Sequence, residues 1–523
     1  MKAKFQKALF VGLVLLLVVT MISACAKPPA ATEAPPATEH PAETEAPPAI
    51  ASPVETEPPS TEPPAETEAP VAGCPNFGDV ALNVMPVAEP YALAFRMYEE
   101  DLKEMFGVSF AFDFTTVPEA FAKIQQDFAL GTSSYDIVLF QPWNLPDMAP
   151  YLEPIEPFAA QYSLDFNQTD WLPRVWSFYT TWNDQWVSMP WDIDVVFLMY
   201  NKSAFENPDH QAKFKEEYGT DLKPPETWDD YAKIAEFFNG WDWAGDGRDH
   251  YGAAETWAAG WPWYMWLPRF AAYGGQYFDE DMNPLINKPA GVEALKNMIA
   301  SKAGMMPGVN NFAYMDQETV FTKGDVAMVF SWTSMGKAAE LGAGSMVKGN
   351  VGYALLPGAM VGDQLVKRAS MEGGWAFGVP KYSKNKDASL CVVWYLTQKD
   401  KHIEISANPD TVIDSGTFSS FEPDSKQCTA FDSGQLWCDF SKASIETGFP
   451  EMFLRGRAEY MDALNFELGQ ALTAGKDPQQ AMDDAAKKWD EITDRYDRDQ
   501  QKADWIKMLS VLEEMDLQYI PWP

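Results

Sequence analysis

The hydrophobic pattern after residue 79 alternates between short apolar runs and amphipathic stretches. It predicts strands at Ala81–Pro86, Val108–Thr116 and Ser134–Phe140, and helices at Tyr91–Phe106 and Pro118–Leu130. Each predicted helix ends before a glycine, which is a common helix terminator. This order predicts an α/β fold with a parallel sheet covered by helices, in which a ligand binds beyond the carboxyl ends of the strands.

A different apolar pattern occupies the N-terminus. Three lysines at positions 2, 4 and 7 precede an apolar run from Ala8 to Ile22. The run is shorter than the roughly 20 residues of a membrane-spanning helix and is typical of a secretory signal peptide. It ends at Ile22-Ser23-Ala24-Cys25, which resembles the bacterial lipobox. The resemblance implies a signal peptide at 1–24 and acylation of Cys25, which would anchor the protein to the outer face of the cell membrane. An uncleaved membrane helix is the alternative.

The segment 25–75 contains mostly Pro, Ala, Glu and Thr. It has too few large apolar side chains to form a core, and its prolines and glutamates favour an extended chain. We interpret it as a tether after the lipid anchor, either a stalk of functional length or a neutral spacer. The globular part then spans 76–523.

The composition narrows the classes of partner. The globular length exceeds that of one ordinary core and predicts two lobes. The chain has 39 Lys and Arg against 76 Asp and Glu, a net charge of -37. This charge disfavours nucleic acid as a partner and disfavours an anionic ligand held by bulk charge.

The chain has five cysteines, and four remain if Cys25 carries the lipid. Four cysteines outside the cytoplasm permit two disulfides. Cys428 and Cys438 are close in sequence and are the first expected pair, which leaves Cys74 and Cys391 as the second. Reduced, buried thiols are the alternative. The chain lacks CxxC and HxxxH spacings, so no transition-metal site is expected.

Several ordered motifs resemble the family-1 extracellular solute-binding proteins, the group that includes maltose-binding protein. The motifs are Tyr135–Val138, Ser188–Asp194 with Leu198–Lys202, Pro224–Tyr231, Phe321–Met328, Glu372–Val379 and the closing stretch Leu464–Trp489. Thr227 within the third motif is expected to cap a helix. The region 409–449 is longer than the family pattern and is left unassigned.

The resemblance implies a periplasmic-binding-protein fold with a hinge and a ligand cleft between two lobes. Lobe 1 would comprise about 76–190 and 355–398, and lobe 2 about 195–352 and 400–523. Hinges are expected near 190–195, 351–357 and 395–401. The implied function is capture of a carbohydrate, an oligosaccharide, and its delivery by lobe closure to the permease subunits of an ABC importer. The protein would be a monomer and not an enzyme.

The candidate ligand-binding residues follow from the motifs and from the count of 20 tryptophans. Indole faces stack on the C–H faces of sugars, and carboxylates accept hydrogen bonds from hydroxyls. The candidates are Glu89, Gln141, Trp143, Trp191, Asp192, Trp263, Trp332, Glu372, Gly374 and Trp375. The same residue types also suit a polyamine or other cationic solute. As an alternative, many of these rings would pack equally well in the hydrophobic core.

Two further interpretations stay open. Asp242, Asp246 and Asp249 surround a glycine turn that resembles a calcium loop, although Ala244 removes one ligand and a solvated turn is the alternative. A lipid-anchored glycoside hydrolase would need a pair of carboxylates at a defined separation. No spacing in the chain singles out such a pair, and a receptor that feeds a sensor kinase is a third alternative.

Overall fold

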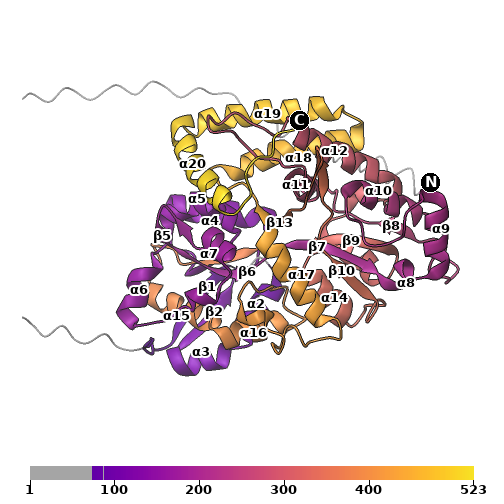
Figure 1. The fold of residues 1–523 in the computed structure, drawn as a ribbon. Coiled ribbons are helices and arrows are strands. Elements are labelled where there is room, and N and C mark those ends of the chain that lie inside the picture. Colours follow the sequence, from indigo (N-terminus) through magenta and orange to yellow (C-terminus); the bar gives the residue numbers. More distant parts are fainter. Residues whose placement is uncertain (1–72, 86–87, 523) are drawn as a thin grey trace, which may run out of the picture. The chain divides into compact units, whose positions relative to one another are not determined.

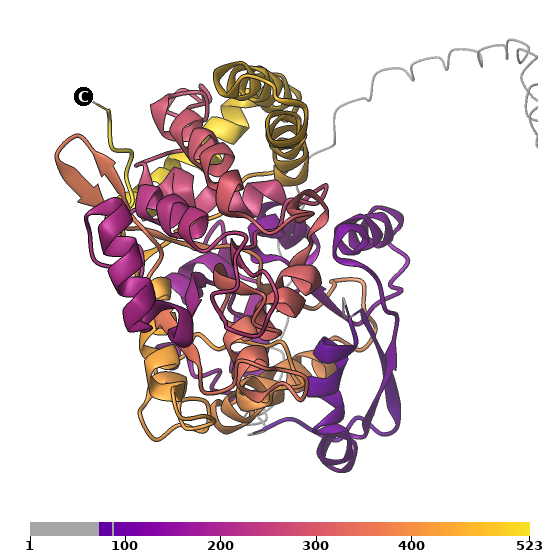
Figure 2. The same cartoon turned by 90° about the vertical axis from the view of Figure 1, so that its right-hand side faces the viewer.

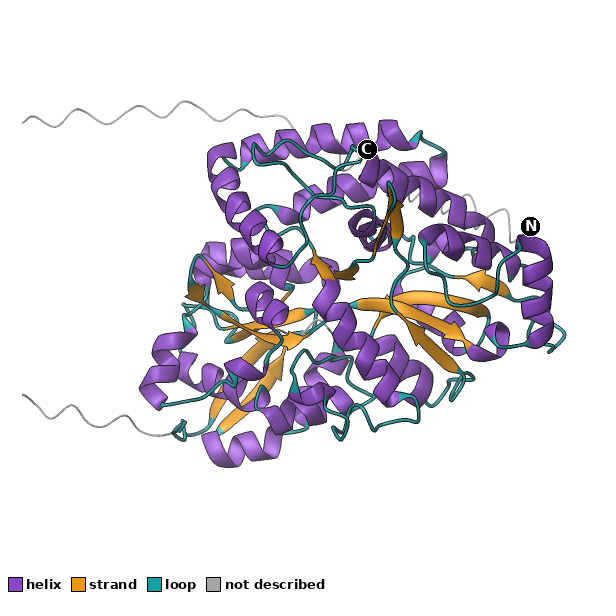
Figure 3. Ribbon diagram, viewed as in Figure 1, coloured by secondary structure: helices purple, strands orange, loops and turns teal. Residues whose placement is uncertain are grey.

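The computed structural model describes residues 73–85 and 88–522. They belong to one compact unit, Glu68–Pro523. The predicted signal peptide, Cys25 and all but the end of the predicted tether lie outside the described residues. Within this unit the main strands gather in two groups, each with its own helices (Figure 3). No helix among residues 73–85 and 88–522 has the length and apolar character needed to cross a bilayer.

The first group is a five-stranded sheet (Figure 1). Its strands, in spatial order, are β2 (Val108–Phe112), β1 (Val80–Met85), β3 (Ile137–Phe140), β14 (Trp375–Gly378) and β6 (Ser188–Asp192). β1 pairs in parallel with β2 and β3, whereas β14 is antiparallel to β3 and β6. The predicted parallel strand order at the start of the domain is therefore confirmed, with shorter second and third strands than expected.

Helices flank this sheet. They are α2 (Glu89–Arg96), α3 (Glu99–Phe106), α4 (Val117–Leu130), α5 (Leu145–Met148), α6 (Ile155–Tyr162), α7 (Pro173–Tyr179), α15 (Lys386–Leu396) and α16 (Lys399–Ala407). A two-residue turn joins the hairpin strands β4 (Thr181–Trp182) and β5 (Gln185–Trp186).

One predicted helix is wrong. The stretch 91–106 forms two helices, α2 and α3, because the chain breaks at Tyr98. The Tyr98 side chain is buried, its hydroxyl donates to Glu404 at 2.9 Å, and its ring packs edge-on against Tyr395 at 5.8 Å. These distant contacts override the local helical pattern. α3 does end at Gly107, whose φ of 68° and close backbone neighbours exclude a larger residue.

The second group is a four-stranded sheet. Its strands, in spatial order, are β10 (Val351–Ala354), β7 (Val196–Asn201), β9 (Val326–Trp332) and β8 (Tyr251–Ala253). Its helices are α8 (Lys202–Phe205), α9 (Pro208–Tyr218), α10 (Trp228–Phe237), α11 (Pro262–Ala272), α12 (Pro289–Ser301), α13 (Tyr314–Thr322) and α14 (Ser334–Leu341). Thr227 caps α10 through a reciprocal bond pattern with Asp230, as expected.

Four C-terminal helices complete the unit: α17 (Gly434–Thr447), α18 (Arg457–Ala474), α19 (Pro478–Arg495) and α20 (Arg498–Glu514). In Figure 2 the gold pair α18 and α19 lies beside the rose helices α11 and α12, which they contact. Small strands connect the parts: β11 (Ala359–Val361) pairs with β12 (Gln364–Val366), and β13 (Ala369–Met371) pairs with β15 (Gly448–Pro450).

The chain passes between the two sheets, which we take as the centres of the two lobes. It leaves the first sheet after β6 and enters the second at β7, so residues 193–195 form the first crossing near its expected place. It returns between β10 and β14. The third expected crossing, at 395–401, is wrong because α16 still contacts the first lobe through Glu404. The second lobe is reached only with α17, which packs on β7 and β10.

Two disulfides fasten this chain path. Cys74 joins Cys391 on α15, and Cys428 joins Cys438 on α17. These are the two pairs that the sequence favoured. The first attaches the beginning of the described chain to the first lobe, and the second fixes part of the region 409–449, which contains the third crossing.

Candidate functional site

A glycine pair between β13 and β14 lies where the two lobes meet. Gly373 and Gly374 have φ of 82° and 71°. A Cβ atom on Gly373 would lie 2.6 Å from Asp194 Oδ2, and one on Gly374 would lie 2.3 Å from the Tyr179 hydroxyl oxygen. Both the backbone conformation and the space therefore require glycine.

Side chains from both lobes bind the backbone of this turn. The Trp143 indole Nε1 donates to the Gly373 carbonyl at 2.9 Å, and the Gly374 N–H donates to Asp194 at 2.7 Å. The Trp332 Nε1, at the end of β9, donates to the Glu372 carbonyl at 2.8 Å. The turn thus connects the first lobe to the second through indole and carboxylate groups.

Three aspartates cluster at the first crossing. Asp192, Asp194 and Asp414 each place a carboxylate oxygen within 4.8 Å of the others. Asp192 accepts hydrogen bonds from the Tyr91 hydroxyl at 3.1 Å and from the Asp414 N–H at 2.7 Å, and Asp414 forms an ion pair with Lys337 at 3.0 Å. Burial, reinforced by Asp414, raises the pKa of Asp192 to about 8. Burial and Asp192 hold the pKa of Asp194 well above its usual range.

Two glutamates lie on the other side of the glycine turn. Glu451 accepts a hydrogen bond from the Gly373 N–H at 2.7 Å and forms an ion pair with Arg457. Burial raises the pKa of Glu451 to about 7, while Arg457 opposes the shift. Burial and then the charge of Glu451 raise the pKa of Glu372 well above its usual range. We call these two glutamates, the three aspartates, Lys337 and Arg457 the central polar cluster.

An aromatic group packs against the same turn. Trp332 lies within 6.1 Å of Trp261, 5.2 Å of Tyr264 and 5.5 Å of Tyr314, measured between ring centroids. Trp263 stacks on Tyr264 at 3.8 Å. All five residues belong to the second lobe: they lie on β9, on α11, at the start of α13 or directly before α11. Gln141, which follows β3 in the first lobe, donates to the Tyr264 hydroxyl at 3.3 Å and so completes the contact between lobes.

The comparisons with known proteins agree with this architecture. Residues 111–401, more than half of the chain, match the family model of the bacterial extracellular solute-binding proteins. The chain belongs to this family. The predicted two-lobed α/β fold is confirmed by solved structures. One is the maltose-bound MalE3 of T. maritima (20% identity, TM-score 0.65, 79% of this chain and 99% of that one). Another is a ribitol-bound solute-binding protein of Agrobacterium radiobacter K84 (19% identity, TM-score 0.67, 80% and 100%).

The matches to curated relatives cover a smaller part of each chain. A probable amino-acid ABC transporter periplasmic-binding protein, y4oP of Sinorhizobium fredii, is 25% identical over 59% of this chain and 66% of its own. A probable ABC transporter-binding protein of Deinococcus radiodurans is 26% identical over 43% of this chain and 51% of its own. The chain thus spans about two thirds of the length of the first relative and about half of the length of the second.

This solute-binding protein brings most of the predicted ligand residues to the glycine turn. The residues in or beside the central polar cluster and the aromatic group are Gln141, Trp143, Asp192, Trp263, Trp332, Glu372, Gly374 and Trp375. The Trp143 ring itself is fully buried against Phe178 and Tyr179, so only its Nε1 reaches the turn.

Two predicted residues do not join them. Glu89 is the first residue of α2, and its side chain is 57% exposed and forms an ion pair with Arg96 on the same helix face. Trp191 is fully buried against Phe377, at 4.4 Å, and beside Phe95. Successive residues of a strand point to opposite faces, so the strand that presents Asp192 to the site turns Trp191 into the core.

Several residues of the site were not predicted. They are Asp194, Tyr264, Lys337, Asp414, Glu451 and Arg457. Asp194 could have been found from its place two residues after Asp192, on the same face of the crossing segment. The others come from helices and loops whose approach depends on tertiary packing, and no local signal marks them.

The loop that resembles a calcium site has a different grouping of side chains from the one in the sequence motif. Asp242 and Asp246 approach each other, but the third member of the group is His250 and not Asp249. Asp242 accepts hydrogen bonds from three backbone N–H groups of its own loop, and Asp246 binds Arg248 and His250. These hydrogen bonds within the loop engage the carboxylate oxygens of Asp242 and Asp246.

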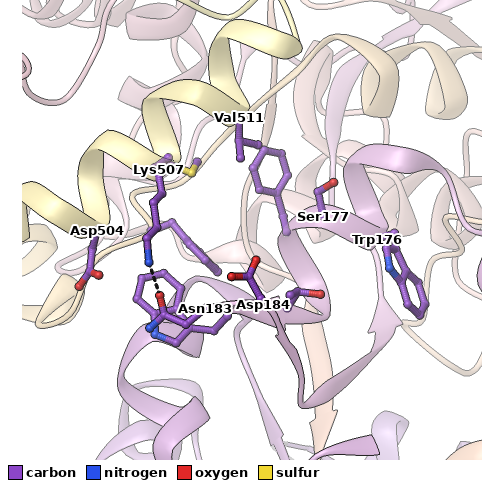
Figure 4. Close-up of a pocket in the computed structure, with 12 residues that line it drawn as sticks. Trp176, Ser177, Asn183, Asp184, Asp504, Lys507 and Val511 are labelled. Carbon is purple, nitrogen blue, oxygen red and sulfur yellow. Dashed lines mark hydrogen bonds between the residues drawn. The ribbon is translucent and has the colours of Figure 1, made fainter. Parts of the chain in front are cut away.

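A separate pocket opens beside the hairpin β4–β5. It has a volume of about 340 Å³ and is lined by Trp176, Trp182, Phe453 and residues of α20. Figure 4 shows the hydrogen bond from Lys507 to Asn183 across it, at 2.6 Å. None of the ten predicted ligand residues lines this pocket.

Proposed function

We propose that this solute-binding protein captures a carbohydrate outside the cytoplasm and delivers it to an ABC importer. The observation that carries the proposal is the convergence of Trp332, Tyr264 and Trp375 with buried carboxylates at the meeting of the two lobes. Flat aromatic faces suit the C–H faces of a sugar ring, and carboxylates accept hydrogen bonds from its hydroxyls. Solved relatives with this fold support the proposal, since their bound molecules are maltose, ribitol and, in the GacH receptor of Streptomyces glaucescens, acarbose.

Binding would couple to movement of the lobes. The candidate rings are nearly closed off, with Trp332 at 5% and Trp375 at 4% exposure, so the solute has to enter while the lobes are apart. Hinged closure over a ligand is common in this architecture. We further propose that acylated Cys25 holds the protein on the outer face of the cell membrane. The segment 25–75 would then act as a tether that lets the receptor reach the permease. Mass spectrometry of the membrane-extracted protein tests the acylation, and loss of membrane association in Cys25→Ala is the expected result.

The ligand class is tested by a thermal-shift screen of mono- and oligosaccharides, polyols and polyamines. A ligand at 100 times its Kd adds about 2.7 kcal/mol to the free energy of unfolding. We expect a saccharide to shift the melting temperature. A shift with polyamines alone contradicts the carbohydrate assignment, and hydrolysis of an oligosaccharide by the pure protein contradicts a purely binding role.

A pair of variants locates the binding site. Trp332→Phe removes the Nε1 donor and narrows the ring, and we expect the Kd of the saccharide to rise at least fivefold. Trp489→Phe is the matched control, because its buried indole also donates to a single carbonyl, that of Tyr460 at 2.7 Å, but lies among the C-terminal helices. Equal effects of the two variants on the Kd contradict a site at Trp332.

A further inference from the structure

The central polar cluster has more buried carboxylates than cations. Five carboxylates surround the glycine turn: Asp192, Asp194, Asp414, Glu372 and Glu451. Lys337 pairs with Asp414 and Arg457 pairs with Glu451. Across residues 73–85 and 88–522, no other lysine or arginine comes within ion-pair distance of the five. Three carboxylates are thus left without a cationic partner.

The nearest histidine does not balance this charge. His402 is buried beside Trp191, with ring centroids 5.9 Å apart, and neither ring nitrogen has a hydrogen-bond partner. Burial, with the charge of Lys337, lowers the pKa of His402 to about 3. The imidazole is therefore neutral at physiological pH.

Glu372 marks where the missing partner belongs. Its side chain is fully buried, and both of its carboxylate oxygens lack a hydrogen-bond partner. The Ser370 hydroxyl is close enough to lower the pKa slightly but makes no hydrogen bond of normal geometry. Burial, and then the charges of Glu451 and Asp194, raise the pKa of Glu372. An unpaired carboxylate without hydrogen bonds is costly to bury, so such a group either takes up a proton or pairs with a cation.

The remaining surroundings suit a cation that also carries hydroxyl groups. Asp194 keeps part of its surface exposed, and the partly exposed Tyr91 packs edge-on against Trp375 at 5.6 Å. The rings of Trp332 and Tyr264 pack edge-on against each other, and the Trp332 indole donates to the Glu372 carbonyl. Aromatic faces attract cations, and they also accept the apolar face of a sugar ring.

We propose that the solute of this site is a polyhydroxylated molecule with a protonated amine, such as an amino sugar, whose ammonium group pairs with Glu372. This inference rests on the proposed carbohydrate function and narrows its ligand class. The ammonium donates up to three hydrogen bonds, which the unpartnered oxygens of Glu372 can accept. The hydroxyls of the solute would donate hydrogen bonds to the remaining free acceptor positions of the aspartates.

Isothermal titration with matched sugars tests the proposal on the full-length protein. The probes are the β-1,4-linked glucosamine disaccharide, its di-N-acetylated form, cellobiose, maltose, spermidine and CaCl₂, all at pH 6.5. The first two share a skeleton and differ in charge. We expect the amine form to bind at least tenfold more tightly than the N-acetylated form.

The variant Glu372→Gln keeps the shape of the side chain and removes its charge. We expect it to weaken binding of the glucosamine disaccharide at least tenfold and to remove the preference for the amine form over the N-acetylated form. Glu340→Gln is the matched control, because Glu340 is also buried but already accepts bonds from Gly349 and Ser433 away from the cluster. Circular dichroism and the melting temperature check that both variants fold, and the comparison of probes on the wild type stands if one does not.

Each contrary outcome has a distinct meaning. Tight binding of cellobiose or maltose with no gain from the amine overturns the inference and leaves the proposed function intact. Binding of spermidine or calcium ions without any saccharide overturns both, and identifies the charge excess as a site for a simple cation. Absence of binding to every probe also overturns both.

Discussion

The buried pair Arg269 and Glu255 offers a sharp test of how the second lobe is stabilised. Both side chains are fully buried, and α11, which carries Arg269, also presents Trp263 to the site. The Arg269 guanidinium donates to Glu255 at 2.7 Å and to Asn297 at 2.8 Å, and lies 4.4 Å from the Trp228 ring. Arg269→Met removes every one of these interactions and leaves a buried carboxylate without a cation.

The expected magnitude follows from that unpaired charge. Breaking a buried ion pair by removing one partner costs roughly 3–5 kcal/mol of the free energy of unfolding. The double variant Glu255→Leu/Arg269→Met should recover at least half of the loss, because the carboxylate is gone. It leaves Trp257, which donates to Glu255 at 3.0 Å, without its acceptor, at a cost of about 1 kcal/mol.

Urea unfolding followed by circular dichroism measures these differences. The control is Arg248→Met, because Arg248 pairs with Asp246 and Asp325 on the surface, where solvent screens the interaction. We expect a several-fold smaller loss in this variant. The reasoning is refuted if Arg269→Met costs no more than Arg248→Met, or if the double variant is as unstable as the single one.

Three further outcomes are expected. Trp191→Phe should lower the melting temperature and leave the Kd for the solute unchanged, since this ring packs in the core; a weaker Kd contradicts that placement. Burial raises the pKa of Asp147 to about 6, so the folded state holds the proton more tightly, and the free energy of unfolding falls by up to about 3 kcal/mol as pH rises from about 4 to 6. Asp147→Asn should remove this part of the slope. Loss of the disulfide Cys74–Cys391, with a sequence separation of 317, should cost about 6 kcal/mol, against about 3 kcal/mol for loss of the disulfide Cys428–Cys438, with a separation of 10. Guanidinium unfolding of the Ser variants ranks the two losses.

Local signals predicted much of the fold. The strands β1 and β3, the end of α3 at Gly107 and the cap at Thr227 depend on residues near in sequence, such as glycine after an amphipathic run or threonine before it. The order of these elements was enough to predict a parallel sheet. The break at Tyr98 was not predictable, because its cause is a hydrogen bond to Glu404, more than 300 residues away.

The candidate site was predictable only in part for a similar reason. Residues beside strand ends, such as Gln141 and Asp192, came to the expected place because strand geometry carries them there. For Trp191, chemistry suggested a ligand platform, but the alternation of the strand decides which way the ring points. Asp414 belongs to the region 409–449, whose path depends on the late third crossing, and no periodicity in its own sequence indicates that it would meet Asp192.

The glycine turn explains how solute binding and lobe closure can be one event. The turn leads from β13 into β14 of the first sheet, and Trp143, which follows β3 of the same sheet, donates to it. The bond from Trp332 to the Glu372 carbonyl joins the second sheet to the same turn. We therefore expect Trp332 to line the candidate site and to hold the turn between the lobes, so that a solute that packs against its ring would stabilise the closed state.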